Sequence, residues 1–393
     1  MPSRSIRPLV PFLLLQFTGT ACSAMIVPFM GFFLIEVLGH PPWVLSIYSA
    51  LMVGTTIITN RVFARRIDVG EPVFPMVGLA AACFCTAAVL IGLFPSLATA
   101  LTVCTLGFGL SASAASTMFS LGGSMAERHD VPRARFNAYM RATMSTAWMV
   151  GPAAAFVVAD AIGPLMVFRL STLAALVWLV LWWRVLPHDV RAESRAPVPE
   201  DIGGQLAFDL RMAAAFVFCL AAAHSLCFQA LPIYYVREVG LPGYAPGTAF
   251  SIKTFVEVFA IFSTPLLISR FGVKRALLGT SLLAVVAIQV LASIQSFPQM
   301  ILGAALEGLY FGLFASLGIT YVQAYAGGRP AAATATYWNT LMITGILAGP
   351  AAGLIAQWQD FRTVLYVASG VALTAPFVMA LGVGLSRRRR AMG

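Results

Sequence analysis

Charged side chains are scarce in this chain of 393 residues. Asp, Glu, Lys and Arg together make up 10% of the sequence, whereas 59% of the residues are hydrophobic. With a mean hydropathy of +0.86, the chain has too little polar surface for a soluble protein of this size. The composition therefore excludes a soluble protein and predicts one that is embedded in a membrane.

Residues and motifs for metal, disulfide and enzyme chemistry are also few. The six cysteines all fall inside apolar runs without C-x-x-C spacing, so we expect them to be small apolar packing residues. The four histidines are scattered, and we predict neither a metal site nor a cofactor. His-Glu-x-x-His and the phosphate-binding Gly-x-x-x-x-Gly-Lys-Ser/Thr are missing, so an enzyme is not predicted. A membrane-embedded enzyme or a passive sensor remains as an alternative of a different class.

Long apolar runs are abundant. About 20 residues cross a ~30 Å hydrocarbon layer as a helix, and the runs are continuous rather than alternating, which excludes a transmembrane barrel. The first run follows Arg4 and Arg7 without a small-residue cleavage site, so we expect a retained span instead of a signal peptide. We predict twelve spans, near residues 9–37, 42–64, 72–94, 97–124, 134–160, 163–186, 209–236, 245–268, 273–294, 298–325, 331–358 and 361–385.

Basic residues gather between alternate spans. With the N-terminus placed in the cytosol, most of them, including Arg387 to Arg390, fall on the cytosolic side, while Arg237 and Arg362 remain outside. This positive-inside bias predicts that both termini are cytosolic. It also accounts for the net charge of +10 without a cationic face, so nucleic acid is not an expected partner.

One stretch of the chain occurs twice. The apolar segment that contains Gly151-Pro152 returns half a chain length later as the segment that contains Gly349-Pro350. A repeat of this length in a membrane chain is typical of a transporter with two similar bundles. We therefore predict an all-α membrane protein whose twelve transmembrane helices form two six-helix bundles, related by duplication. The predicted parts are residues 1–186, a cytosolic linker at 187–208, and residues 209–393.

Four short motifs lie in or beside the predicted spans. They are Arg141-x-x-x-Ser145-x-Ala147-Trp148-x-x-Gly151-Pro152, Tyr321-x-Gln323, Tyr337-x-Asn339-Thr340, and Glu257 followed by Arg270-x-Gly272-x-Lys274-Arg275. Together with the layout of the spans, they resemble the major facilitator superfamily and, within it, the bacterial sugar efflux transporter family. The resemblance implies a transporter of the bacterial inner membrane that exposes a central cavity to each side in turn. In the loop at residues 60–66, the Gly and Asp of the superfamily signature are missing.

Four charged residues lie deep in the predicted spans: Arg141, Lys253, Glu257 and Glu307. A charge in the hydrocarbon layer costs about 2.5–3.5 kcal/mol, so such side chains tend to face a cavity or a partner. At about 1.5 Å per residue, Arg141 and Glu257 reach similar depths, and the resemblance implies that their spans pack together. We expect the two to pair in one conformation and to separate in the other, with protonation of Glu257 weakening the pair. A static ion pair, or an arginine bound to backbone carbonyls, is the alternative.

Lys253 has two possible partners. Glu257 is four residues further on the same helical face, and Glu307 lies at a similar depth in another span. Glu307 is therefore a second proton site, a hydrogen-bond acceptor for the substrate, or the partner of Lys253.

A sugar needs hydrogen-bonding side chains and aromatic faces. The candidates are Gln16, Ser113, Asn137, His224, Gln229, Tyr321, Gln323, Trp338 and Asn339. The resemblance favours Gln16 and Gln229, because it places the first span of each half along the central cavity. The alternatives are that Ser113 bonds its own helix, that Trp338 packs or anchors at the membrane interface, and that His224 is a packing residue instead of a proton relay.

The two Gly-Pro pairs are expected to bend their helices and to admit a close neighbour. The resemblance implies that Gly151-Pro152 marks an exporter, whereas a packing kink without directional meaning is the alternative. The predicted function is the export of sugars or sugar analogues in exchange for protons, by a chain that acts as a monomer. The alternative is export of another small polar compound, such as a drug or a metallophore.

Overall fold

The computed structural model describes residues 7–131, 133–191, 204–325 and 330–392. Within these ranges the protein is helical and has twelve helices that are long and apolar enough to cross a membrane, which confirms the predicted number of spans. The first six spans are built from α1 (Val10–Phe32) with η2 (Phe33–Val37), α2 (Trp43–Asp68), α3 (Phe74–Leu93), α4 (Leu97–Thr99) to α6 (Ser113–Arg128), α7 (Arg133–Ala161) and α8 (Pro164–Val185). The other six are α9 (Gly204–Ile233) with η4 (Tyr234–Glu238), α10 (Ala245–Phe271), α11 (Val273–Ala292), α12 (Phe297–Gln323), α13 (Pro330–Trp358) and α14 (Phe361–Met392).

The chain forms two compact units. The first comprises residues 1–196 and the short segment Pro242–Gly247, and the second comprises the remainder. Residues 192–203, which make up much of the predicted linker at 187–208, lie outside the described residues. The linker and its boundaries therefore stay predictions.

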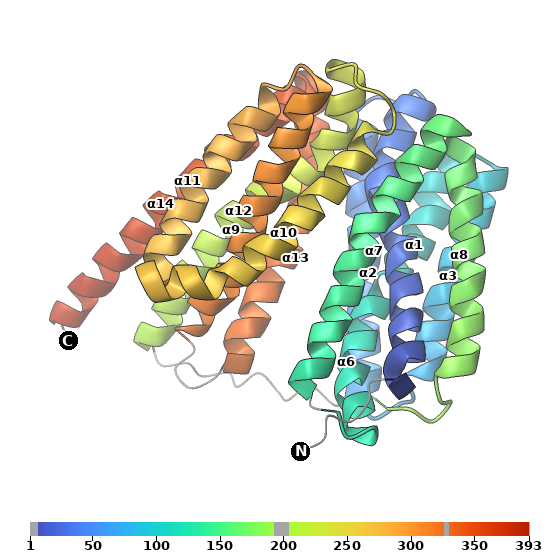
Figure 1. Cartoon of the computed structure of the whole chain (residues 1–393), viewed down its shortest axis with the longest axis horizontal. Coiled ribbons are helices and arrows are strands. Elements are labelled where there is room, and N and C mark those ends of the chain that lie inside the picture. The colour runs from blue at the N-terminus through green and yellow to red at the C-terminus, as the bar shows by residue number, and fades with distance from the viewer. Residues whose placement is uncertain (1–6, 132, 192–203, 326–329, 393) are drawn as a thin grey trace. The chain divides into compact units, whose positions relative to one another are not determined.

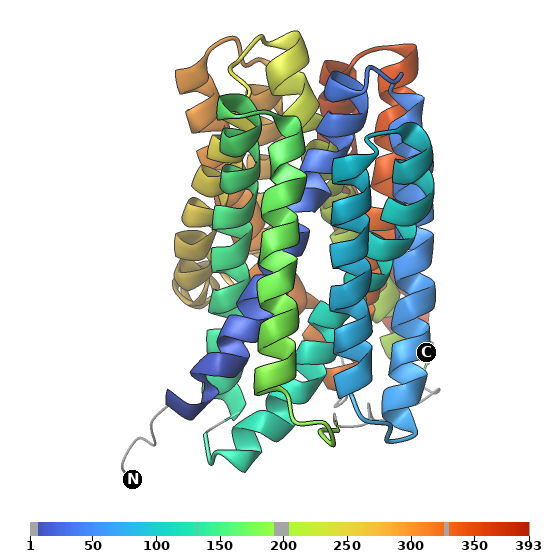
Figure 2. The ribbon, with the colours of Figure 1, turned by 90° about the vertical axis from the view of Figure 1, so that its right-hand side faces the viewer.

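In the first unit, drawn from blue to green in Figure 1, α1 packs against α7 and α8, and α3 packs against α8. Figure 2 shows the long helices of this unit side by side, joined by short loops. Aromatic rings fill the space between them: the ring of Phe29 lies 5.6 Å from that of Phe156 on α7 and 5.8 Å from that of Phe168 on α8. Gly151 lets α7 approach α1, since a Cβ at this position would lie 2.8 Å from the Cβ of Ala24.

The second unit repeats these pairings with the corresponding spans. Here α9 packs against α13 and α14, and α11 packs against α14. The first span of each unit also ends in a π-helical segment, η2 in one unit and η4 in the other, a few residues after Pro28 and Pro232 respectively. The proline removes a backbone donor, and the wider helical turn is one way to accommodate it. Duplicated sequence and duplicated packing therefore agree.

The fourth span differs from the single helix predicted at residues 97–124. It contains a π-helical segment, η3 (Ala100–Cys104), followed by α5 (Thr105–Ser111), and its helix is interrupted at Ala112. Ser111 donates to the carbonyl of Phe108 at 2.8 Å, and Ser113 donates to that of Leu110 at 2.6 Å. Hydroxyls that bond the preceding turn bend helices, which explains the interruption and also accounts for the hydroxyl of Ser113.

Candidate functional site: a charged cluster in the second unit

Helices α9, α10 and α12 bring four ionisable side chains together. They are His224 of α9, Lys253 and Glu257 of α10, and Glu307 of α12, which we call the charged cluster. All four lie within candidate membrane spans. His224, Lys253 and Glu307 are buried, with exposed fractions of 8%, 7% and 3%. The structure thus brings the three charged residues predicted in these spans together with His224.

Lys253 and Glu257 form an ion pair along α10. The ammonium Nζ of Lys253 donates to Oε2 of Glu257 at 3.3 Å, and the two side chains are 9% and 19% exposed. Residues four apart share a helical face, so the helix itself sets this geometry. Of the two possible partners of Lys253, Glu257 is thus the one in direct contact, while Glu307 interacts with Lys253 electrostatically.

Glu307 instead faces His224. Its Oε1 lies 3.5 Å from Nδ1 of His224, and that same Nδ1 lies 3.2 Å from the hydroxyl of Tyr310. Oε1 is buried and makes no hydrogen bond with the residues that the structure describes. A carboxyl and an imidazole at this distance can hold a proton and pass it on, within a span where few other groups can do so.

The aromatic ring of Phe311 joins the two pairs. The imidazole of His224 stacks on it, with ring centroids 3.7 Å apart and an interplanar angle of 21°. The ammonium of Lys253 lies 4.4 Å from the centroid of the same ring, which is a cation–π contact. Neither Phe311 nor Tyr310 was among the predicted site residues. The available signals were the position of Tyr310 one helical turn after Glu307 and the Phe-Gly-Leu sequence shared by the fourth and tenth spans.

Two glycines on α12 allow α10 to come this close. A Cβ at Gly308 would run into the backbone carbonyl of Lys253, and one at Gly312 would lie 2.5 Å from the carbonyl of Glu257. The two glycines are four residues apart, the small-xxx-small spacing that lets membrane helices pack backbone to backbone. They therefore position the residues that carry the charges.

The predicted residues of the first unit lie in a second polar region. Gln16 of α1 is buried, and its Nε2 donates to the carbonyl of Met140 on α7 at 3.2 Å. Its Oε1 is buried and accepts no hydrogen bond from a described residue. Arg141, the next residue of α7, is exposed, and the side chain of Asn137 lies outside the described residues. Because Arg141 and Glu257 belong to different units, their pairing stays a prediction.

The other substrate candidates are spread over the second unit. Tyr321 is buried, with its ring 5.8 Å from that of Phe216. Gln229 is half-buried, while Gln323, Trp338 and Asn339 are exposed. Their roles in binding stay predictions.

Both Gly-Pro pairs, Gly151-Pro152 and Gly349-Pro350, lie inside long helices that continue past the proline. Their link with the direction of transport stays a prediction too.

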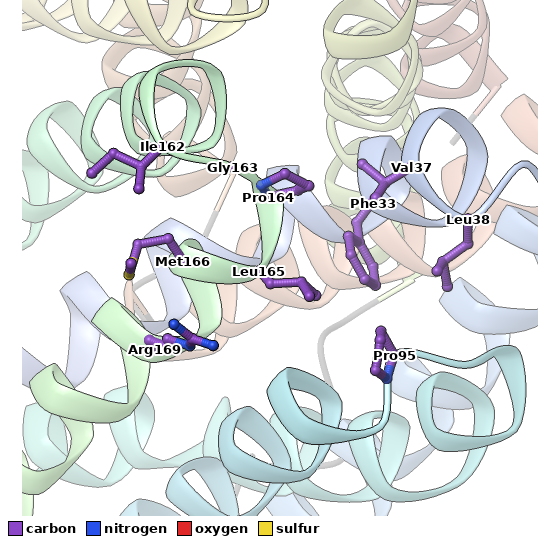
Figure 3. Close-up of a pocket in the computed structure, with 10 residues that line it drawn as sticks. All are labelled: Phe33, Val37, Leu38, Pro95, Ile162, Gly163, Pro164, Leu165, Met166 and Arg169. Carbon is purple, nitrogen blue, oxygen red and sulfur yellow. The ribbon is translucent and has the colours of Figure 1, made fainter.

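The first unit also contains a cavity of about 390 Å³, shown in Figure 3. Its lining comes from the end of the first span, from Pro95 and from the turn into α8, with Arg169 as the charged member. The rest of the lining is apolar, and no predicted site residue takes part. Few groups there can hydrogen-bond a polar solute, so we assign the candidate site to the charged cluster.

Comparisons with known proteins agree with the fold and the spans. Residues 213–391 match the family model of the Major Facilitator Superfamily. The chain is 24% identical to the sugar efflux transporter A of Escherichia coli over 370 residues, which are 94% of each chain. It is 25% identical to the sugar efflux transporter B of Salmonella typhimurium over 266 residues, or 67% of each chain.

Two solved structures show the same fold at low sequence identity. The nucleoside transporter NupG superposes with a TM-score of 0.78 at 13% identity, over 95% of this chain and 98% of that one. A bacterial homologue of the iron transporter ferroportin, in an inward-facing state, superposes with a TM-score of 0.73 at 17% identity, over 96% and 98%.

The curated relatives and the family model, together with the twelve apolar spans, indicate a membrane transporter and not an enzyme. The second half of the chain thus resembles the Major Facilitator Superfamily, and the chain as a whole resembles the bacterial sugar efflux transporters.

Proposed function

We propose that the chain exports sugars or sugar analogues from the bacterial cytoplasm in exchange for protons. The observation that carries this proposal is the charged cluster, because buried carboxylates within membrane spans are expensive and are typical of proton pathways. The relatives named as sugar efflux transporters supply the substrate class and the direction. The superfamily hosts many cargoes, so another small polar compound, a drug or a metallophore, is the competing substrate.

In this mechanism Lys253, Glu257 and Glu307 of the charged cluster respond to protons, and Arg141 of the first unit acts with Glu257 as a gate. The substrate contacts are drawn from Gln16, Asn137, His224, Gln229, Tyr321, Gln323, Trp338 and Asn339. The two units rock against each other, so that the site opens to one side of the membrane at a time. The chain acts as a monomer in the cytoplasmic membrane, with both termini in the cytosol, as the distribution of basic residues favours.

Everted membrane vesicles test the function. We expect vesicles that contain the chain to accumulate a radiolabelled sugar when their lumen is made acidic, and to lose this uptake when a protonophore collapses the gradient. Vesicles from cells without the chain are the control. Uptake of a cationic drug in place of every sugar tested would move the assignment to the competing substrate class, and uptake of neither would refute it.

A further inference from the structure

The charged cluster contains two acid–base pairs, Lys253 with Glu257 and His224 with Glu307, and the two pairs differ in charge. Lys253 and Glu257 neutralise each other at 3.3 Å. Among the described residues, Glu307 forms an ion-pair contact with the imidazole of His224, which is charged only when protonated, while Lys253 acts on it electrostatically from further away. One ammonium therefore stands against two carboxylates, and the cluster carries one negative charge when the imidazole is neutral and both carboxyl groups are ionised. A single added proton makes it neutral.

Helix α13 adds no charged group to the surroundings of Glu307 and His224, because it carries no Asp, Glu, His, Lys or Arg between Pro330 and Trp358. On α14 the charged residues are Arg362, at the start beside Tyr234, and the arginines at its end. Cys227 of α9 and Tyr235 of η4 interact with Glu307 electrostatically. The groups that face the imidazole are thus Tyr310, Glu307 and, across the Phe311 ring, Lys253 with Glu257.

Tyr310 gives the imidazole two distinct hydrogen-bonding states. An unprotonated Nδ1 accepts a hydrogen bond from the phenol, which lies at 3.2 Å. A protonated Nδ1 can only donate, and the buried Oε1 of Glu307 stands at 3.5 Å with no hydrogen bond from a described residue. The stacked ring of Phe311 keeps the imidazole plane in place in both states.

We propose that the exchanged proton is held between His224 and Glu307, one proton per transport cycle. This inference rests on the proposed function and names the proton site within it. The proton enters from the solvent on one side and leaves to the solvent on the other. Without it, the carboxylate needs other hydrogen-bond donors, and the hydroxyls of a sugar are such donors. The proton and the sugar thus bind to the charged cluster alternately, as an exchange mechanism requires.

Purified protein in proteoliposomes with a pH dye in the lumen tests the assignment. An outward gradient of a transported sugar should acidify the lumen for the wild type. For Glu307→Gln we expect this proton movement to fall at least tenfold, while the exchange of labelled for unlabelled sugar without a gradient continues at a measurable rate. The control variant Gly279→Ala, at a helical position of α11 where a Cβ would meet nothing within 4 Å, should move protons like the wild type. For His224→Gln, the pH of half-maximal proton movement should shift by one unit or more, an effect that a packing role would not produce.

The outcomes separate the two proposals. If the wild type transports sugar without moving protons, the proposed exchange fails. If the wild type moves protons and Glu307→Gln does so equally fast, or if His224→Gln keeps the wild-type pH profile, the exchange stands and the assignment to this pair is overturned. If Glu307→Gln fails to fold, the pH profile of His224→Gln decides.

Discussion

At the scale of single residues, the ion pair of Lys253 and Glu257 is held in place from two sides. The helix puts the two side chains four residues apart, and the ring of Phe311 receives the ammonium at 4.4 Å. Removing one partner of such a buried pair leaves the other charge without a counter-charge in a low-dielectric environment. This lowers the stability of the protein by about 3–5 kcal/mol, whereas removing both partners lowers it far less.

Lys253→Met should therefore lower the stability of the protein by about 3 kcal/mol, because Glu257 loses its counter-charge. The double variant Lys253→Met with Glu257→Gln should recover most of the loss. Thermal unfolding of the purified protein in detergent measures both. Equal destabilisation by the single and the double variant would show that the two side chains are not coupled.

The sequence predicted the members of the cluster better than their partners. Lys253, Glu257 and Glu307 stand out because charges are rare inside apolar spans. Which residue lies beside which depends on the rotation and approach of three helices, and one sequence does not contain that information. Tyr310 and Phe311 were missed for the same reason, since a tyrosine or a phenylalanine in a membrane span is ordinary packing material.

At the scale of helices, glycines set the closest approaches in both units. In the first unit a Cβ at Gly109 would lie 2.7 Å from the carbonyl of Met52 on α2, and in the second unit one at Gly312 would lie 2.5 Å from the carbonyl of Glu257 on α10. These are the fourth span against the second and the tenth against the eighth, so the duplication preserved the contact. In the second unit, the residues of α10 at this contact include the charged Lys253 and Glu257.

Gly308→Ala should disturb the cluster without changing any of its members. The new methyl group meets the backbone carbonyl of Lys253, which cannot rotate away, so α10 has to move. Overpacking of this kind costs about 1–3 kcal/mol. We expect lower thermal stability together with reduced sugar-driven proton movement.

Gly279→Ala is the matched control for that change. No atom lies within 4 Å of a Cβ at this helical position of α11, so stability should stay within about 0.5 kcal/mol of the wild type. If both substitutions act alike, the close packing at Gly308 does not position the charges.

The number and order of the helices followed directly from the apolar runs, because a membrane span must be long and continuous. The interruption of the fourth span at Ala112 did not, since Ser111 and Ser113 also occur in unbroken helices. Likewise the π-helical ends of the first and seventh spans depend on how each proline is accommodated, which hydropathy does not report.

At the scale of the whole molecule, the repeated sequence corresponds to two units with the same helix pairings. The distribution of basic residues predicts how the chain is oriented in the membrane. If both termini are cytosolic, the turn between α7 and α8 lies outside the cell, and the turn between α2 and α3 lies inside.

Labelling of introduced cysteines tests this orientation. Ile162 and Val69 lie in those two turns and are 67% and 77% exposed. A membrane-impermeant maleimide should label Ile162→Cys in intact spheroplasts, and should label Val69→Cys only after the membrane is opened. The unmodified chain is the control for its native cysteines. The opposite pattern would invert the topology and, with it, the direction of export.

The central claim is that a proton gradient drives sugar across the membrane through these two units. The most direct measurement is the sugar gradient at which net flux stops in proteoliposomes, with the membrane potential held at zero and the pH difference varied. One proton per sugar predicts that each pH unit, about 1.4 kcal/mol, balances a tenfold sugar gradient. A null point that stays at equal sugar concentrations for every pH difference would contradict the account.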